Sequence, residues 1–198
     1  MIALIDYYAG NVRSIENAFN KLGTTVTLTK KPSDLEKADA IILPGVGNFG
    51  DAMKQLETYR KTLKEEVASG KPFLGLCLGI QIILEKSMEA SGVKGLGLIK
   101  GECRKFPGKL KVPHMGWNSV KYARENALFK GIPQESYFYF VHSYYPVPED
   151  KDVIAATTEY GVTFPSVIIK DNIMATQFHP EKSGLMGLKL LENFAKLI

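Results

Sequence analysis

Short, wholly apolar runs that alternate with helical periodicity in the first half of the chain most constrain the fold. The runs are IALID at 2–6, ADAIILP at 38–44 and FLGLC at 73–77. A strand without a polar face must be covered on both sides, which is typical of parallel strands in α/β proteins. Between these runs, apolar residues recur three and four apart, as in NVRSIENAFNKLG at 11–23. We therefore expect an α/β fold in which a twisted sheet has helices on both faces.

The rest of the chain adds further helices and a group of strands. Helical spacing predicts helices over residues 50–68 and 79–90. Residues 95–178 read mostly as strands, among them SYFYFVHSYY at 136–145. The Asp171-Asn172 turn predicts a hairpin between the last two of these strands.

Nothing in the sequence divides the chain into parts. A final segment of helical periodicity, 184–198, follows the strands without a linker, and the chain has no repeat or low-complexity stretch. We therefore expect the 198 residues to form a single domain, 1–198. Because its sheet combines the apolar strands with the hairpin, we expect a mixed sheet with some antiparallel hairpins.

The composition and charge exclude several functional classes. The 25 Lys and Arg residues are scattered, the net charge is only +4, and RKFPGKLK at 104–111 reads as a solvated loop, so we expect no nucleic-acid partner. The two cysteines, Cys77 and Cys103, lack metal-ligand spacing and a disulfide framework, which indicates a reducing compartment and no metal. MIALIDYY at 1–8 lacks the features of a signal peptide, and no apolar run is long enough to cross a membrane. We expect a cytoplasmic protein.

Cys77 lies where the apolar run 73–77 gives way to a helical segment, with a glycine two residues to each side. The sequence GLCLG at 75–79 has the form of a nucleophile elbow, G-x-S-x-G, with cysteine in place of serine. Glycines allow the sharp turn, and the free N–H groups of the following helix favour a thiolate and can bind an oxyanion. So short a motif also occurs by chance, and a buried structural cysteine remains the alternative.

His179 is the favoured base for a cysteine nucleophile. It follows the apolar run IMATQF, and Pro180 restricts it to an extended backbone. Residues two apart in an extended segment face the same side, so Glu181 is placed to accept the ring N–H of His179 and fix its tautomer. Cys77 and His179 both follow strands, and catalytic groups in α/β sheets gather at the carboxyl ends of strands. An exposed His-Pro turn with an incidental glutamate remains the alternative.

Two further histidines and a second glycine-rich turn give weaker signals. Neither His114 nor His142 has an acid two residues away, and we expect a packing or contact role for His114 and a structural or orienting role for His142. PGVG at 44–47 ends an apolar run and exposes backbone N–H groups. It lacks the complete motif of a P-loop or a dinucleotide site, so we expect no nucleotide cofactor. Its better use is the second half of an oxyanion hole facing Cys77, with a plain strand-to-helix turn as the alternative.

Together these motifs resemble those of the class I glutamine amidotransferases. GLCLG and HPE mark this family, whereas PGVG with NFGDAM, PHMGWN, YFYFVHSYY and ATQFHPEKSG resemble its branch of glutaminase subunits that serve imidazole glycerol phosphate synthase in histidine biosynthesis. Together with IALIDYYAGNVRSI at 2–15, these segments run from the first strand to the last helix, so the resemblance covers nearly the whole chain. It implies the family's fold, a twisted, mostly parallel and flavodoxin-like sheet with helices on both faces, and it implies no metal and no cofactor.

The resemblance implies a role for each motif residue. Cys77 would attack the side-chain amide of glutamine, with His179 as the base and Glu181 holding its ring. Water would then hydrolyse the thioester and release glutamate. The other implied roles are an oxyanion hole from Leu78 and the Val46-Gly47 segment, and substrate binding by Gly47, Gln81, Ser143 and Tyr144.

The resemblance also implies a partner. The family's glutaminase forms a heterodimer with a (β/α)₈-barrel cyclase subunit, which uses the ammonia to make imidazole glycerol phosphate and aminoimidazole carboxamide ribotide. Asn11, Trp117 and Tyr139 match positions that face this partner, and a polar loop residue, a packed tryptophan and a strand aromatic are the plain alternatives. Because the family's glutaminase is weak until the partner and its ligand bind, we expect Gly47 to belong to a loop that reorients.

Three other functions fit parts of the sequence. A glutaminase could serve another synthase, such as one that makes pyridoxal phosphate, and only the acceptor enzyme would differ. A γ-glutamyl hydrolase or peptidase would cleave its substrate without a partner. A non-catalytic module on the same fold requires a damaged triad, whereas Cys77, His179 and Glu181 are all present.

Overall fold

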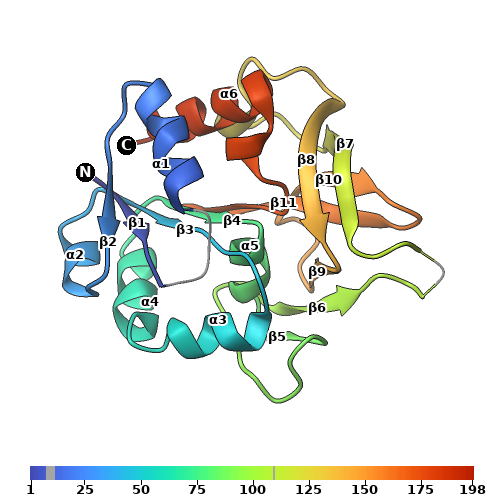
Figure 1. Ribbon diagram of the computed structural model, residues 1–198, viewed down its shortest axis with the longest axis horizontal. Coiled ribbons are helices and arrows are strands. Elements are labelled where there is room, and N and C mark those ends of the chain that lie inside the picture. Colours follow the sequence, from blue (N-terminus) through green and yellow to red (C-terminus); the bar gives the residue numbers. More distant parts are fainter. Residues whose placement is uncertain (8–11, 109) are drawn as a thin grey trace.

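The predicted apolar runs lie beside one another in a large sheet. The computed structural model describes residues 1–7, 12–108 and 110–198. The strands of this sheet are β1 (Ile2–Ile5), β2 (Val26–Thr29), β3 (Ala40–Leu43), β4 (Phe73–Leu76), β7 (His114–Tyr122), β8 (Ser136–His142), β10 (Ile154–Glu159), β11 (Thr163–Lys170) and β12 (Ile173–Thr176). Among the described residues, these nine strands follow the order β2-β1-β3-β4-β12-β11-β10-β7-β8 (Figure 1). The three runs are β1, β3 and β4, which are adjacent.

The sheet is mixed as predicted, but the expectation that it is mostly parallel does not hold. The strands from β2 to β12 pair in parallel, which makes four of the eight pairings between its described strands. The four pairings from β12 to β8 are antiparallel. Short connections account for two of these antiparallel pairings, β10 with β11 and β11 with β12. A short turn such as Asp171-Asn172, which joins β11 to β12 as predicted, connects antiparallel strands, because a parallel pair needs a crossover of about a dozen residues.

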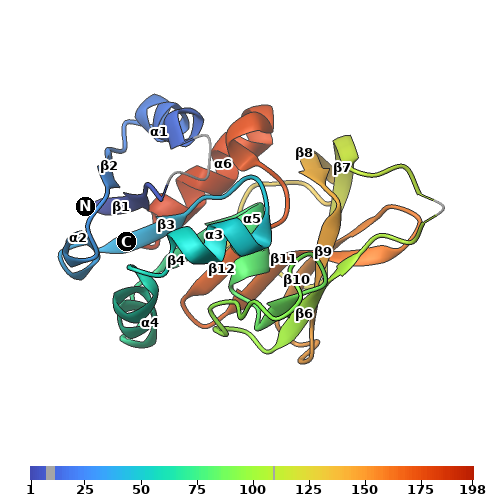
Figure 2. The same cartoon turned by 60° about the horizontal axis from the view of Figure 1, so that its bottom comes forward.

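Helices cover both faces of the sheet, as the sequence predicts. One face carries α1 (Val12–Lys21) and α6 (Gly184–Ala195), and the other carries α2 (Ser33–Glu36), α3 (Phe49–Gln55), α4 (Arg60–Ala68) and α5 (Leu78–Ile82) (Figures 1 and 2). Alternate residues of β1 belong to two separate apolar clusters. Ile2 and Leu4 pack in the cluster of α1 and α6, whereas Ala3 and Ile5 pack in the cluster of the other helices. This two-residue period is that of a strand buried on both faces.

A second, smaller sheet holds β5 (Lys86–Ser87), β6 (Gly101–Lys105) and β9 (Tyr144–Pro148). SYFYFVHSYY, which reads as one strand, therefore divides at Ser143 between β8 and β9 of the two sheets. There the Ser143 carbonyl accepts a hydrogen bond from the Phe106 N–H at 3.2 Å, so the backbone leaves the first sheet and joins the second. Two short 3₁₀ helices, η1 (Ala127–Phe129) and η2 (Pro180–Lys182), complete the described elements.

The helix predicted over 50–68 is two helices, α3 and α4. Between them the N–H groups bond three residues back, as from Tyr59 to the Leu56 carbonyl, which tightens the turn. Leu56 and Tyr59 are both buried in the same apolar cluster. The break therefore lets both side chains reach the core.

The helix predicted over 79–90 ends at Ile82. Its carbonyls at 82–84 accept hydrogen bonds from the N–H groups of residues 96–99, which come from a loop later in the chain. Gly95 allows this loop to approach, because a Cβ there would lie 2.0 Å from the Leu84 carbonyl oxygen. A longer helix would need those same carbonyls for its own ladder.

Candidate active site

Cys77 lies in a sharp turn between β4 and α5. Its backbone torsions, φ 54° and ψ −101°, lie in a region that L-residues rarely adopt, which is the strained turn of a nucleophile elbow. Packing excludes a side chain at Gly79 and leaves little room for one at Gly75. A Cβ on Gly79 would lie 2.5 Å from the Leu43 carbonyl oxygen, and one on Gly75 would lie 3.1 Å from the Gly79 carbonyl carbon. Cys77 itself is only 6% exposed, so protein atoms almost enclose its sulfur.

His179 and Glu181 form a buried pair beside this turn. β12 runs parallel to β4 with Thr176 opposite Leu76, so the residues after β12 come next to Cys77. His179 is extended, with φ −99° and ψ 93°, and its Nδ1 lies 2.8 Å from Oε1 of Glu181. Their side chains are 3% and 2% exposed, and among the described residues His179 Nε2 has no hydrogen-bond partner. Nδ1–H therefore donates to the carboxylate, which leaves the Nε2 lone pair to accept a thiol proton.

The electrostatics of this cluster favour a protonated His179. Burial by itself lowers the pKa of His179, but the neighbouring Cys77 sulfur and the Glu181 carboxylate outweigh burial and raise that pKa well above its ordinary value. His179 can therefore take the thiol proton of Cys77 and later donate it, so the cluster can supply a nucleophile and a proton donor.

One cavity of about 230 Å³ joins the predicted nucleophile, base, oxyanion and substrate residues. They meet because PGVG follows β3, the elbow follows β4 and His179 follows β12, and the carboxyl ends of adjacent parallel strands share one edge of a sheet. Glu181 lies behind His179 and does not line the cavity. The lining residues are Val46, Gly47, Cys77, Leu78, Gln81, Glu89, Pro113, Val141, His142, Ser143, Tyr144 and His179.

The PGVG loop contacts the residue that follows Cys77. The Leu78 N–H, which is one predicted oxyanion donor, bonds to the Gly45 carbonyl at 3.2 Å. It is therefore occupied in this structure, and it can bind an oxyanion only if the loop moves. Gly47 has φ 102°, in the region that favours glycine, and Val46 is 40% exposed.

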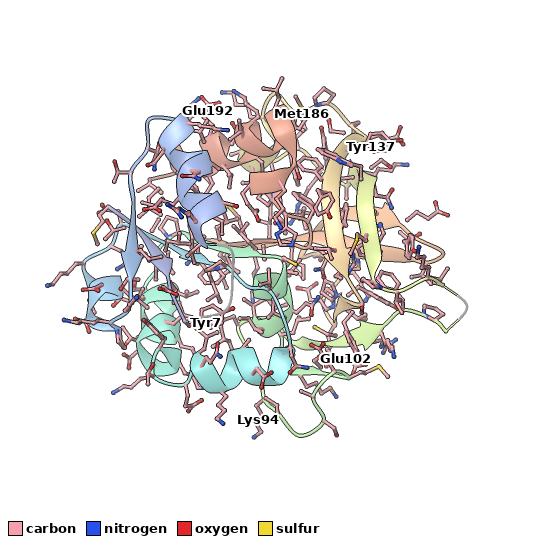
Figure 3. All side chains as sticks on the ribbon, in the orientation of Figure 1. Tyr7, Lys94, Glu102, Tyr137, Met186 and Glu192 are labelled. Atoms are coloured by element: carbon pink, nitrogen blue, oxygen red, sulfur yellow. The ribbon has the colours of Figure 1, made fainter. Side chains whose placement is uncertain are left out.

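Tyr7 holds the start of this loop, and the sequence did not mark it. Its side chain is buried, and its hydroxyl donates to the Pro44 carbonyl at 2.7 Å (Figure 3). Burial raises the pKa of Tyr7 far above its ordinary value, and the charge of Cys77 adds to this rise. The hydroxyl therefore stays protonated and remains a donor to the loop.

The sequence matches the model of a known protein family. The model described as glutamine amidotransferase class-I matches residues 3–197, which is nearly the whole chain. The chain belongs to the class I glutamine amidotransferases. Two relatives of this amidotransferase, from Methanocaldococcus jannaschii and Methanothermobacter thermautotrophicus, are 56% and 54% identical to it over 198 residues. These alignments cover 100% of this chain and 100% and 99% of the relatives, which are both named imidazole glycerol phosphate synthase subunit HisH.

Solved structures share the fold of this amidotransferase at low sequence identity. PurLQS from Thermotoga maritima aligns with a TM-score of 0.76 at 18% identity, covering 99% of this chain and 97% of that one. A glutamine amidotransferase from Thermotoga maritima aligns with a TM-score of 0.65 at 18% identity, covering 99% and 82%. The sheet and its two helical layers are thus a fold found in another solved amidotransferase.

Glu89 is a cavity residue of the amidotransferase that the sequence did not mark. Its Oε2 accepts a hydrogen bond from the Phe49 N–H at 2.7 Å, at the start of α3. In the sequence it falls in the segment 79–90, where a helix was expected and an exposed carboxylate is ordinary. Only the early end of α5 at Ile82 brings it to the cavity wall.

His114 and His142 of the amidotransferase form a neutral pair beside the cavity. Nδ1 of His142 lies 2.8 Å from the Tyr144 carbonyl, which can only accept, so this nitrogen carries the proton. Nδ1 of His114 lies 3.0 Å from Nε2 of His142 and therefore donates to it. Burial lowers the pKa of His142 to about 3 and that of His114 to about 4, so both are uncharged at neutral pH. With its nitrogens engaged, His142 orients the segment at Ser143-Tyr144, in line with its expected structural role.

Two of the three predicted partner residues lie on the outer strand pair β7–β8 of the amidotransferase. Trp117 is 55% exposed and pairs with Tyr139, their ring centroids being 6.3 Å apart. The Tyr139 carbonyl accepts a hydrogen bond from the His179 N–H at 2.9 Å, so β8 directly supports the base. Tyr137, two residues before Tyr139, is 60% exposed (Figure 3). Asn11 lies outside the described residues.

The described residues show no metal site and no membrane span. They hold no group of three or more side chains able to ligate a metal ion, and no described helix is long and apolar enough to cross a membrane. Cys77 and Cys103 are both free and buried.

Proposed function

We propose that this amidotransferase is the glutaminase subunit of an imidazole glycerol phosphate synthase in histidine biosynthesis. It hydrolyses glutamine to glutamate and ammonia and delivers the ammonia to a partner cyclase. The observation that carries the proposal is the cluster of Cys77, His179 and Glu181 at a cavity large enough for a small substrate. The HisH relatives at 56% and 54% identity support the choice of synthase.

The reaction follows from the protonation states of the cluster. The Cys77 sulfur attacks the side-chain amide carbon of glutamine, after its proton has passed to His179 Nε2. The tetrahedral intermediate collapses as Nε2–H protonates the leaving nitrogen, which departs as ammonia and leaves a thioester. Water, deprotonated by the now neutral His179, then attacks the thioester carbon and expels the Cys77 thiolate, giving glutamate. Glu181 keeps the Nδ1 proton in place throughout.

The oxyanion is held by the Leu78 N–H and by an N–H of the Val46-Gly47 segment. For this to occur, the bond between Leu78 and the Gly45 carbonyl must break and the loop must turn an N–H toward the cavity. The positive φ of Gly47 supports a loop that can adopt a second conformation. The occupied Leu78 N–H supports the proposal that the glutaminase becomes active only when its partner binds.

The substrate is positioned by groups on the cavity wall. Gln81, Ser143 and Tyr144 line the cavity together with Cys77 and fit the glutamine backbone and its carboxylate. Glu89 lines the cavity, and its carboxylate supplies the negative charge that the α-ammonium group of glutamine needs. Its Oε2 accepts the hydrogen bond from the Phe49 N–H, which leaves Oε1 to accept from the ammonium group.

The partner is a (β/α)₈-barrel cyclase subunit, bound on the face of Trp117 and Tyr139, and the resemblance assigns Asn11 to the same interface. This heterodimer would use the ammonia on a ribonucleotide to make imidazole glycerol phosphate and aminoimidazole carboxamide ribotide. The exposure of Trp117 and the hydrogen bond that the His179 N–H donates to the Tyr139 carbonyl support this face, because it is both apolar and next to the base. We assign the whole chain, 1–198, to one domain working in the cytoplasm, and the free cysteines support a reducing compartment.

The test is a glutaminase assay with four mixtures. Glutamate release is measured for the chain alone, with the cyclase, with the cyclase and its ribonucleotide ligand, and for Cys77→Ala with both. We expect release to be strongest with both additions and absent in the variant.

Each other outcome points to a different function. Full activity alone on γ-glutamyl peptides would indicate a hydrolase, and stimulation by a different synthase would change the acceptor. Activity that survives Cys77→Ala would overturn the mechanism.

A further inference from the structure

Gln177 lies in register with the nucleophile. Thr176 is paired with Leu76, and the Cys77 N–H donates to the Thr176 carbonyl at 2.8 Å, so the next residue of that segment comes beside Cys77. Gln177 is fully buried, and its own N–H donates to the Ser166 carbonyl at 2.8 Å. Gln177 and His179 are two residues apart, and both reach the sulfur. Neither the triad nor the oxyanion hole gives Gln177 a function.

The orientation of the Gln177 amide follows from its neighbours. Gln81 Nε2 lies 2.9 Å from the Tyr144 carbonyl, which only accepts, so the nitrogen end of Gln81 is defined. The same nitrogen lies 3.1 Å from the Gln177 amide and donates to it, so that atom of Gln177 is the oxygen, Oε1. The other end of the amide, Nε2–H, therefore faces the Cys77 sulfur at 3.9 Å. A backbone carbonyl thus determines, through Gln81, that Gln177 presents a donor to the nucleophile.

The second contact of the sulfur has the opposite preference. The Val141 carbonyl lies 3.8 Å from the Cys77 sulfur and accepts a hydrogen bond from the thiol. Once the thiol has lost its proton, the carbonyl oxygen accepts no hydrogen bond from the sulfur and lies beside an anion. The carbonyl therefore favours the thiol over the thiolate. The amide N–H of Gln177 has the reverse effect, because a hydrogen bond to the charged form stabilises that form.

We propose that Gln177 is a catalytic residue whose Nε2–H donates to the Cys77 thiolate, and that Gln81 holds this amide in the donating orientation. The proposal rests on the proposed function in that it takes Cys77 as the nucleophile. The site is buried, so the interaction is weakly screened and the amide cannot exchange its partners for water. Gln81 then has two tasks, since it contacts the substrate cavity and orients the group that stabilises the sulfur.

The test measures the reactivity of Cys77 as a function of pH. The full chain is treated with iodoacetamide, and modification of the peptide that contains Cys77 is followed by mass spectrometry, which separates it from Cys103. Gln177→Met keeps the length of the side chain but donates no hydrogen bond. We expect the midpoint of the rate profile to rise by about one pH unit, and the rate below the midpoint to fall roughly tenfold, as expected when a hydrogen bond to a charged group is lost.

Two other variants and a control isolate the amide. In Gln177→Glu a carboxylate faces the sulfur, so we expect a larger upward shift than in Gln177→Met. In Gln81→Met, which leaves residue 177 in place, the amide loses its orienting bond and the midpoint also rises. Thr176→Val is the control, because it removes a neighbouring buried hydroxyl, which donates to the Phe178 carbonyl, without touching the sulfur. The midpoint of its rate profile should equal that of the wild-type chain.

The outcomes separate this proposal from the proposed function. If Cys77 of the wild-type chain reacted like an ordinary exposed thiol, the result would count against Cys77 as the nucleophile. A reactive Cys77 whose midpoint is the same in every folded variant of Gln177 and Gln81 would overturn the role of Gln177 alone. If the substitutions at 177 prevent folding, Gln81→Met decides by its midpoint.

Discussion

A single carboxylate, Glu181, controls the proton on the ring of His179. It is buried 2.8 Å from Nδ1, and the raised pKa of His179 depends on it together with Cys77. An elevated pKa means that the folded protein keeps the imidazolium to a higher pH than the free side chain does. Removing the charge of Glu181 should therefore lower the pKa of His179 and also slow the reaction.

In Glu181→Gln we expect the pKa of His179 to fall, because the amide carries no charge to stabilise the imidazolium. The pH above which the imidazolium is lost therefore moves downward, and glutamate release in the complex falls roughly 10²- to 10⁴-fold. The measurements are a ¹⁵N NMR titration of the histidine and the glutaminase assay.

Glu192→Gln is the matched control for this experiment. Glu192 lies on α6, pairs with Lys189 and Lys196 at the surface, and does not line the cavity (Figure 3). Its replacement should leave both readouts unchanged. If the pKa of His179 were as high in Glu181→Gln as in the wild-type chain, Cys77 alone would account for its elevation.

The elbow between β4 and α5 depends on how closely neighbouring backbones approach. At Gly79 an added methyl group would lie 2.5 Å from the Leu43 carbonyl oxygen, which is backbone and cannot turn away. Gly79→Ala should therefore lower the free energy of unfolding by ~1–3 kcal/mol or more. Gly108→Ala is the control, because no atom lies within 4 Å of its added Cβ. Urea unfolding of both variants checks this, and equal losses would contradict the packing explanation.

The PGVG loop is the element that we expect to change conformation on activation. Gly47 has φ 102° with open space around it, so Gly47→Ala restricts the backbone without a clash. We expect turnover stimulated by the cyclase and its ligand to fall roughly tenfold or more, since backbone strain of this kind costs ~1–3 kcal/mol. The affinity for the cyclase should not change.

Gly92→Ala is the comparison for Gly47→Ala, because Gly92 has φ 82° and the same open surroundings but does not line the cavity. It should lose stability while keeping stimulated turnover. If Gly47→Ala kept full stimulation, the loop would not be the switch.

At the scale of the whole molecule, the two edges of the large sheet differ. β8 closes one edge and contributes Val141 and His142 to the wall of the cavity, whereas β2 closes the other edge (Figure 1). Since Trp117 is exposed on β7 beside β8, Trp117→Ala should weaken binding to the cyclase by about 2 kcal/mol or more. Titration calorimetry measures this.

Leu28→Ala tests the opposite edge, since Leu28 is 40% exposed on β2. It should leave the affinity for the cyclase unchanged. An equal effect of both variants would place the interface elsewhere. The thermal unfolding of each variant alone shows whether the chain remains folded.

Local patterns in the sequence were sufficient for part of this protein. The alternation of apolar runs and amphipathic segments predicted the strands β1, β3 and β4 and the helices on both faces of their sheet. This was possible because the spacing of buried residues along a strand or helix involves neighbours only two to four positions apart. The glycines around Cys77 predicted the sharp turn, and Pro180 predicted the extended His179, for the same local reason.

Contacts between distant segments decided the rest. The break between α3 and α4 and the early end of α5 arise from packing in the core and from hydrogen bonds to a loop later in the chain. Glu89 and Gln177 carry no local signal, because each matters only through the atom that the fold places beside it. The sequence by itself thus determined which residues can react. The tertiary structure decided which groups surround the sulfur and that the Leu78 N–H is occupied, since these depend on the pairing of β4 with β12 and on where the loop after β3 comes to rest.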